Sequence, residues 1–388
     1  MNHKKSLTGN ANQAFWRIGF RPFFSLGSLF AMGIIVYWLM ALSGYFGLMV
    51  TSLWHAHEML YGFGSAILAG FLLTALQNWS GERGLHGQKL QALVILWLLG
   101  RFAAVFSNHF LGNDLVFAVI DLSFFPAVLY FAHPYLKPQK RQHLFYGILG
   151  LFIIANGLYH YSDETARNGI YLALHLYLLL SVFIGGRVIP AFTRNSLNGI
   201  SLHSVKVLEK GVLAVSILWL GVESLRFWLP NLETVAAGLA LLAAGLHSLR
   251  WIAWKPWKSL HKPLLMVLPL AYFWMLIGLA LRGLWGYNTI VTHFFAVGVM
   301  GGLMHGMMTR VALGHTGRPL NASGLTITGY ICLQFALLSR TIGIVFWPEL
   351  YLTLLYLTGG AWCLAFALYT VEYLPILLQA RPDGRTDS

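Results

Sequence analysis

Apolar stretches long enough to cross a bilayer recur along the whole chain, and they constrain its fold more than any other feature. The first, residues 23–42, has the length of about 20 residues that an α-helix needs to span the hydrocarbon core. Hydrophobic residues make up 57% of the 388 residues and charged residues 10%, against about 45–50% and about 25% in soluble proteins. The chain is therefore not a water-soluble globule, and we expect an all-α polytopic membrane helix bundle.

We predict about twelve transmembrane helices, of which the two on either side of Pro230 and Asn231 are the least well separated. No internal repeat is evident, and the connections are too short for an appended soluble domain. We therefore predict a single transmembrane domain over residues 1–380 and a mobile cytoplasmic tail over residues 381–388. The predicted spans are 23–42, 55–78, 90–108, 114–134, 143–160, 168–190, 207–228, 233–253, 264–282, 290–313, 326–346 and 350–373.

The positive charges alternate between connections as the positive-inside rule predicts. If the N-terminus lies in the cytoplasm, nearly all of the 26 Lys and Arg residues fall in cytoplasmic connections, and Arg101 lies inside a span. The exceptions, on the other face, are Arg167, Arg226, Arg282 and Arg340. Both termini are therefore expected in the cytoplasm. The net charge of +13 belongs to these connections, so nucleic acid is not an expected partner.

Histidines are numerous for so apolar a chain, which has 15 of them. Those within about the outer third of a predicted span are His55, His57, His109, His160, His175 and His293. Imidazoles that converge at one depth from several helices are what a transition-metal or haem site in a bundle requires. Polar side chains inside a membrane are also costly and are functional candidates by default. Because Cys332 and Cys363 lie inside apolar stretches, any metal must be held by histidine, methionine or carboxylate.

The second predicted span opens with two histidines and a glutamate, His55, His57 and Glu58. At about 100° per residue, the two histidines of a regular helix project about 200° apart and cannot chelate one metal together. Either the start of this helix is unwound, or the two histidines serve different sites. A structural alternative is a polar helix start in which the positive end of the helix dipole stabilises Glu58.

Arg101 and Asp121 lie at equal depth on adjacent antiparallel spans. A buried ion pair explains both residues, because a lone charge inside the membrane would be costly. A functional interpretation stays open beside it, in which Arg101 holds a haem propionate or Asp121 relays protons inward. Glu58 is a second candidate proton relay, on the outer side.

Five strings of residues, in order along the chain, resemble motifs of the NnrS family over about residues 15–375. They are GFRPFF at 19–24, WHAHEM at 54–59, QNWSG at 77–81, GRVIPAFT at 186–193 and LGHTGRP at 313–319. The resemblance implies a bacterial inner-membrane protein with haem and copper, associated with nitric oxide metabolism and resistance to nitrosative stress. The family's motif histidines correspond to His55, His57, His293 and His315, with Glu58 beside the first pair.

The resemblance and the depths of the histidines together give an expected ligand set. A haem b would be noncovalent, because the chain has no CxxCH motif, and its preferred ligands are His57 and His293. Further cofactor-binding candidates are Arg101 and His315. The candidate ligands of a metal, copper above all, are His55, His57, His160, His175 and His293. The candidate catalytic residues, which would handle protons, are Glu58 and Asp121.

The leading functional hypothesis is an oxidoreductase that binds nitric oxide at a periplasm-side haem–copper site and reduces it to nitrous oxide. Two metals suit this reaction, since two nitrogen atoms must come within bonding distance while electrons and protons arrive. The expected partners are nitric oxide, membrane lipid, and a quinol or periplasmic electron donor. Two alternatives stay open. One is a non-catalytic protein that scavenges or senses nitric oxide, and the other is a twelve-span transporter of copper or an organic anion.

Overall fold

The computed structural model describes residues 14–45, 50–106, 114–139, 143–197, 199–202 and 206–384. Within these ranges the regular elements are helices and no strand occurs, which confirms the predicted all-α class. Eleven helices there are long and apolar enough to cross a membrane. Eight of these eleven contain a continuous α-helix: α2 (Phe20–Leu42), α5 (Gly87–Phe106), α6 (Asp114–Leu136), α7 (Leu144–Tyr161), α8 (Asp163–Ser196), α10 (Glu233–Ala253), α11 (Pro263–Trp285) and α16 (Tyr351–Leu378).

Three further spans are α-helices that contain a π-helical stretch. The first joins α3 (Ser52–His57) to α4 (Ser65–Ser80) through Glu58–Gly64. The second joins α12 (Thr289–His293) to α13 (Gly302–His315) through Phe294–Gly301. The third joins α14 (Gly324–Leu338) to α15 (Ile344–Phe346) through Ser339–Gly343. In the first two, the wide turn begins directly after a histidine that the sequence singled out, and π-helical turns are frequent at functional sites.

The one predicted span outside these eleven, 207–228, corresponds to α9 (Lys206–Leu225). This helix is 20 residues long, but it carries four charged residues, Lys206, Glu209, Lys210 and Glu223. Its charges keep it out of the set of strongly apolar spans. The short turn Pro230–Leu232 separates it from α10, so the predicted break between these two helices is present.

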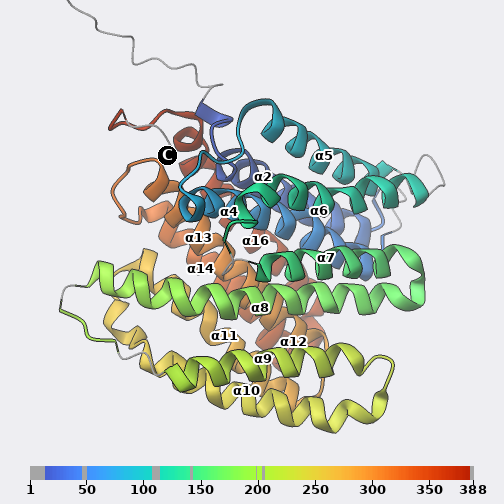
Figure 1. The fold of residues 1–388 in the computed structure, drawn as a ribbon. Helices are drawn as coiled ribbons and strands as arrows, with labels where there is room; N and C mark the ends of the chain where they lie inside the picture. Colours follow the sequence, from blue (N-terminus) through green and yellow to red (C-terminus); the bar gives the residue numbers. More distant parts are fainter. Residues whose placement is uncertain are drawn as a thin grey trace, which may run out of the picture. The chain divides into compact units, whose positions relative to one another are not determined.

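Figure 1 shows the helices of the described chain, which form two compact units by their contacts. The first comprises Met1–Ile170, Met308–Leu320 and Phe366–Ser388, and the second comprises Tyr171–Met307 and Asn321–Ala365. In the first unit, α4 packs against α2 and α6, while α6 also contacts α5 and α7. In the second, α10 lies between α9 and α11, and α11 packs on the π-helical stretch Phe294–Gly301. The domain boundary at residue 380 stays a prediction, and residues 385–388 of the tail lie outside the described residues.

Candidate metal centre

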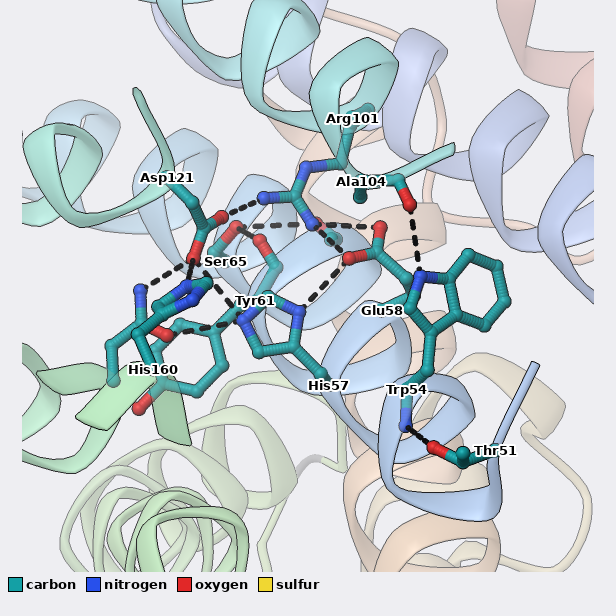
Figure 2. A network of polar contacts seen from close by, with 12 residues as sticks. Thr51, Trp54, His57, Glu58, Tyr61, Ser65, Arg101, Ala104, Asp121 and His160 are labelled. Atoms are coloured by element: carbon teal, nitrogen blue, oxygen red, sulfur yellow. Dashed lines mark hydrogen bonds and ion pairs between the residues drawn. The ribbon is translucent and has the colours of Figure 1, made fainter. Parts of the chain in front are cut away.

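Six polar side chains meet inside the first unit, close to the N-terminal end of its second span; Figure 2 shows the group, with all of its members except Asn156 labelled. Four helices supply them. The members of this group, here called the His57 cluster, are His57, Glu58, Arg101, Asp121, Asn156 and His160. The side chains of His57 and Glu58 are fully buried, and that of His160, the most exposed of the ionisable members, is only 7% exposed. Buried polar groups in such number need mutual partners, because water is not available to satisfy them.

Local structure explains how the α3 end of the cluster is held. The hydroxyl of Thr51 accepts a hydrogen bond from the backbone N–H of Trp54 and caps α3. The indole N–H of Trp54 donates to the carbonyl of Ala104 on α5 at 3.0 Å, and that of Trp97 donates to the carbonyl of Gly62 at 3.1 Å. A β-carbon at Gly62 would collide with the ring of Phe30. The glycine in the wide turn therefore permits the close approach of Phe30 on α2, while the two indole hydrogen bonds hold α5 and its arginine beside His57.

Both ring nitrogens of His57 face oxygen atoms. Nδ1 lies 2.9 Å from Oε1 of Glu58, and Nε2 lies 3.1 Å from Oδ2 of Asp121 and 3.0 Å from Oδ1 of Asn156. The amide nitrogen of Asn156 donates to Asp121 Oδ2 at 2.6 Å, so its oxygen, which only accepts, is the atom that faces His57. An imidazole in this position either carries hydrogen on both nitrogens or holds a cation at Nε2.

Arg101 links the two carboxylates of the cluster. Its Nη1 donates to both oxygens of Glu58, at 2.8 and 2.7 Å, and its Nη2 donates to Oδ1 of Asp121. The predicted ion pair between Arg101 and Asp121 is thus present, and Glu58 is a third member that the spacing did not reveal. Two carboxylates against one guanidinium leave one negative charge, which a second hydrogen on His57 or a bound cation balances.

Three members of the cluster offer ligand atoms to one point. The atoms of His57, Asp121 and His160 all lie within 4.8 Å of one another, and His160 Nε2 is 3.1 Å from Asp121 Oδ2. Two imidazoles and a carboxylate are borderline-hard ligands that suit divalent transition metals. Glu58 on the far nitrogen of His57 gives the carboxylate–histidine arrangement that commonly fixes a metal-binding imidazole. The residues present therefore fit a small metal ion.

Comparison with known proteins agrees with the sequence motifs. A family model described as NnrS protein matches residues 14–381. The chain belongs to the NnrS family. It is a multi-pass membrane protein of a family linked to the nitric oxide response. No curated protein and no solved structure matches the chain.

Haem ligation by His57 does not fit the same surroundings. The imidazole is stacked between two tyrosine rings, Tyr61 at 5.0 Å and Tyr159 at 4.1 Å between ring centroids, with interplanar angles of 19° and 24°. Since both of its nitrogens also face side-chain oxygens, no side of the ring is open to a porphyrin. In this NnrS-family chain, the surroundings of His57 therefore fit a small metal ion and leave no open side for a haem.

The other predicted histidines lie in different surroundings. His55 stacks on Trp38, with ring centroids 4.8 Å apart, and so does not join His57. This agrees with the expectation that the two side chains of a regular helix project about 200° apart. His315, also in the first unit, packs on Phe20 with ring centroids 5.6 Å apart. His109 lies outside the described residues.

Two predicted histidines belong to the second unit. His175 of α8 is fully buried and its Nε2 is 3.1 Å from the hydroxyl of Tyr287. His293 places Nδ1 2.6 Å from the carbonyl of Thr289 and Nε2 3.3 Å from Nε of Arg340, which donates to it.

Sequence reasoning missed Asn156 and the two tyrosines that flank His57. Asn156 did carry a signal, because it is a buried amide within an otherwise apolar span and lies one helical turn before His160, hence on the same face. Tyr61 and Tyr159 carried none, since tyrosine is frequent throughout this chain and is common at membrane interfaces.

Proposed function

We propose that the chain is a copper-dependent, nitric oxide-handling protein of the bacterial inner membrane, with His57, Asp121 and His160 as the copper ligands. The observation that carries this proposal is the convergence of two imidazoles and a carboxylate within 4.8 Å in a buried part of the first unit. Family membership supports the link to nitric oxide. The apolar spans support the location, because an uncharged gas partitions into lipid and reaches such a site without a polar channel.

Copper is the first candidate ion on chemical grounds. Both cysteines of the chain, Cys332 and Cys363, belong to the second unit, so the His57 cluster offers only nitrogen and oxygen ligands. For such ligands the affinity of divalent first-row metals is highest for copper. A bound copper ion would supply a redox-active centre that binds nitric oxide.

The remaining residues of the cluster orient and neutralise the ligands. Glu58 holds the hydrogen on Nδ1 of His57, which leaves Nε2 to face Asp121 and His160. Arg101 pairs with both carboxylates and holds them in place, and the amide of Asn156 fixes Oδ2 of Asp121. An ion held at Nε2 would take the place of the hydrogen that otherwise balances the charge of the cluster. Tyr61 and Tyr159 cover the two faces of the imidazole and exclude water.

The reaction that we propose is reduction. Two molecules of nitric oxide, two electrons and two protons give one nitrous oxide and one water. The electrons come from a quinol or a periplasmic donor. Glu58 and Asp121 are the groups of the cluster that handle protons near the ion, as the sequence analysis expects.

The test combines metal content with turnover. Purified wild-type protein is compared with His57→Ala, His160→Ala and Asp121→Asn, and with His55→Ala as a matched control that changes a neighbouring histidine outside the cluster. We expect copper bound by wild type and His55→Ala and lost from the other three. With nitric oxide and a reductant under anaerobic conditions, the copper-loaded protein is expected to release nitrous oxide. A stoichiometric spectral change without nitrous oxide would contradict reduction, and equal copper in all five proteins would contradict the site.

A further inference from the structure

Three histidines on three different spans follow one another at a constant interval. His57, His175 and His293 are each 118 residues apart (57, 175, 293). Each lies in the N-terminal half of a long span, in α3 and α4, in α8, and in α12 and α13 respectively. By the alternation of charges along the chain, all three of these spans run from the outer face to the cytoplasm.

Three glycines repeat at the same interval. Gly81, Gly199 and Gly317 (81, 199, 317) follow the cytoplasmic ends of the same three spans. Their φ angles are 73°, 75° and 68°, a left-handed conformation that glycine adopts without the strain imposed by a side chain. The backbone therefore repeats at the interval that the histidines define.

The interval assigns three tandem copies of a repeat of four spans. The first copy runs from α2 to α6, the second from α7 to α10 and the third from α11 to α16. This division differs from that into two compact units. The copies differ sharply around the histidine. At the positions of Glu58, Arg101 and Asp121, the second copy has Leu176, Trp219 and Leu239. In the second copy, the counterpart of the His57 cluster thus keeps the histidine but has no carboxylate at the positions of Glu58 and Asp121.

The second unit has a small cavity at this counterpart. The cavity, of about 10 Å³, lies between α8, α9, α10 and α11, and both His175 and Trp219 line it. Nδ1 of His175 and Nε1 of Trp219 are buried and have no hydrogen-bond partner among the described residues. The side chain of His175 is fully buried and Trp219 is 4% exposed. Unsatisfied buried nitrogens of this kind call for a ligand, because leaving them unpaired is costly.

The other polar groups of the cavity wall are already satisfied. Tyr272 donates to Nδ1 of His247 at 2.6 Å, since its own oxygen accepts from Arg250 at 2.9 Å. Ser216 donates to the carbonyl of Val212 at 2.6 Å, so its oxygen accepts from Nε2 of His247 at 3.0 Å. The rest of the wall is leucine, valine, Ala243 and Met275. Only the two unpaired nitrogens are available to an occupant.

Both of these nitrogens carry hydrogen. Burial raises the pKa of the Tyr287 phenol well above its usual range, so Tyr287 keeps its hydrogen. In the described chain the one acceptor within reach of that hydroxyl is Nε2 of His175. A neutral imidazole that accepts at Nε2 has its hydrogen on Nδ1. The guanidinium groups of Arg226 and Arg282 lie 5.8 and 5.9 Å from the Tyr287 ring, and their charges disfavour a second hydrogen on His175.

From these donors we propose that the cavity binds one small neutral molecule that accepts hydrogen bonds and donates none, of the class of diatomic oxides. The lining has no carboxylate and no Lys or Arg, so an ion would have no counter-charge. The volume admits only one or two non-hydrogen atoms. Water fits poorly, because its two hydrogens would find no acceptor on this wall. Nitric oxide and carbon monoxide both meet the description, and the site does not depend on copper at the His57 cluster.

The indole N–H of Trp219 gives a direct test. The protein is placed in lipid nanodiscs, with its tryptophans labelled with ¹⁵N in the indole, and the indole N–H signals are recorded by nuclear magnetic resonance. The chain has 14 tryptophans, and the Trp219 signal is identified as the one that Trp219→Phe removes. All titrations with carbon monoxide use a His57→Ala background, so that the proposed copper site does not contribute. We expect a saturable shift of the Trp219 signal, with the other tryptophans shifting less and in proportion to dissolved gas.

Two variants and a control complete the experiment. Ala243→Leu fills the cavity from α10 and leaves both donors in place, and His175→Phe removes one donor. Each is expected to weaken binding at least tenfold, while His55→Phe, the same change outside the cavity, leaves it unaltered. A Trp219 signal that does not move, or that moves only in proportion to dissolved gas, overturns the proposal. So does saturable binding that survives Ala243→Leu. If His175→Phe shifts all the signals and so has not folded, Ala243→Leu alone decides.

Discussion

The His57 cluster and the cavity beside His175 occupy corresponding positions in two copies of the repeat, yet one histidine has charged surroundings and the other apolar surroundings. The first surrounds the imidazole with two carboxylates, a guanidinium and an amide, and each of these side chains has at least one hydrogen-bond partner. The second replaces the charges with leucine and tryptophan and leaves two buried N–H groups without a partner on residues that line a small space. Charge makes the first suitable for a cation, and its absence makes the second suitable for a neutral molecule.

The largest expected effect comes from breaking the charge balance of the His57 cluster. Arg101→Met leaves Glu58 and Asp121 as buried carboxylates without their cation, and we expect a loss of about 3–5 kcal/mol in the free energy of unfolding. Thermal or denaturant unfolding in mixed micelles measures it. Adding Glu58→Gln and Asp121→Asn to the same protein is expected to restore most of the loss. The exposed Arg83→Met serves as a control, expected within about 0.5 kcal/mol of wild type, and a similar small effect at Arg101 would contradict the charge argument.

A second, smaller effect separates ligands from the groups that orient them. Glu58→Gln removes the charge that holds His57 and Arg101, and we expect copper affinity to fall about 10–100-fold, as for other partners of metal-binding histidines. Competition with a chromophoric chelator measures the affinity. Glu223→Gln changes an equally buried glutamate of the second unit and is expected to leave copper affinity unchanged. Equal losses in both variants would mean that the effect is a general destabilisation.

The third prediction tests the equivalence of the copies through their backbone. Ala at Gly81 or Gly199 forces a left-handed residue to carry a side chain, which costs about 1–2 kcal/mol, and neither position has atoms in the way of the added β-carbon. We expect the two losses to agree in unfolding experiments. Gly317→Ala is expected to cost more, because its added β-carbon would lie 3.1 Å from Asp383. Gly33→Ala, in open space within α2, is the control and is expected to be neutral or stabilising. Unequal losses at Gly81 and Gly199 would weaken the repeat.

The smallest expected effect concerns the N-cap residues of α3 and α12, the two helices that end in a histidine followed by a π-helical stretch. Thr51 caps α3 through the N–H of Trp54, and Asn288 caps α12 through two backbone N–H groups. Replacement by alanine is expected to cost about 1 kcal/mol at each, with the larger loss at Asn288, which satisfies two donors. Unfolding free energies of the two single variants decide this order, and a larger loss for Thr51→Ala would reverse it.

Features that depend on depth and apolar length could be predicted from the sequence. The spans followed from hydropathy, and the pairing of Arg101 with Asp121 followed from their equal depth on neighbouring helices. The divergence of His55 from His57 followed from helical geometry. The place of Glu58 in the cluster could not be predicted in this way, because it depends on the wide turn Glu58–Gly64 and on the approach of α5 to Gly62. Neither feature has a signature in apolar periodicity.

The repeat could not be predicted from the apolar residues for a related physical reason. Leucine, valine, phenylalanine and alanine exchange freely on surfaces that face lipid or a membrane core, so equivalent spans lose their likeness without losing their fold. What survives are positions with a special requirement, such as a left-handed glycine or a buried imidazole. The depth of His175 in its span indicates a functional candidate, and its relation to His57 rests on the interval of 118 residues and on the left-handed conformation that Gly81, Gly199 and Gly317 share.

The wide turn after His57 has a consequence for how this protein can change. A π-helical turn accommodates one residue more than an α-helical turn, so it sets the rotational phase between the His57 end of the span and the rest of α4. If the seven residues Glu58–Gly64 were wound as a regular α-helix instead, His57 would be rotated by about 100° relative to α4. The span would still be helical, but the cluster would not form. The extra residue in this turn is thus required by the site and not by the fold.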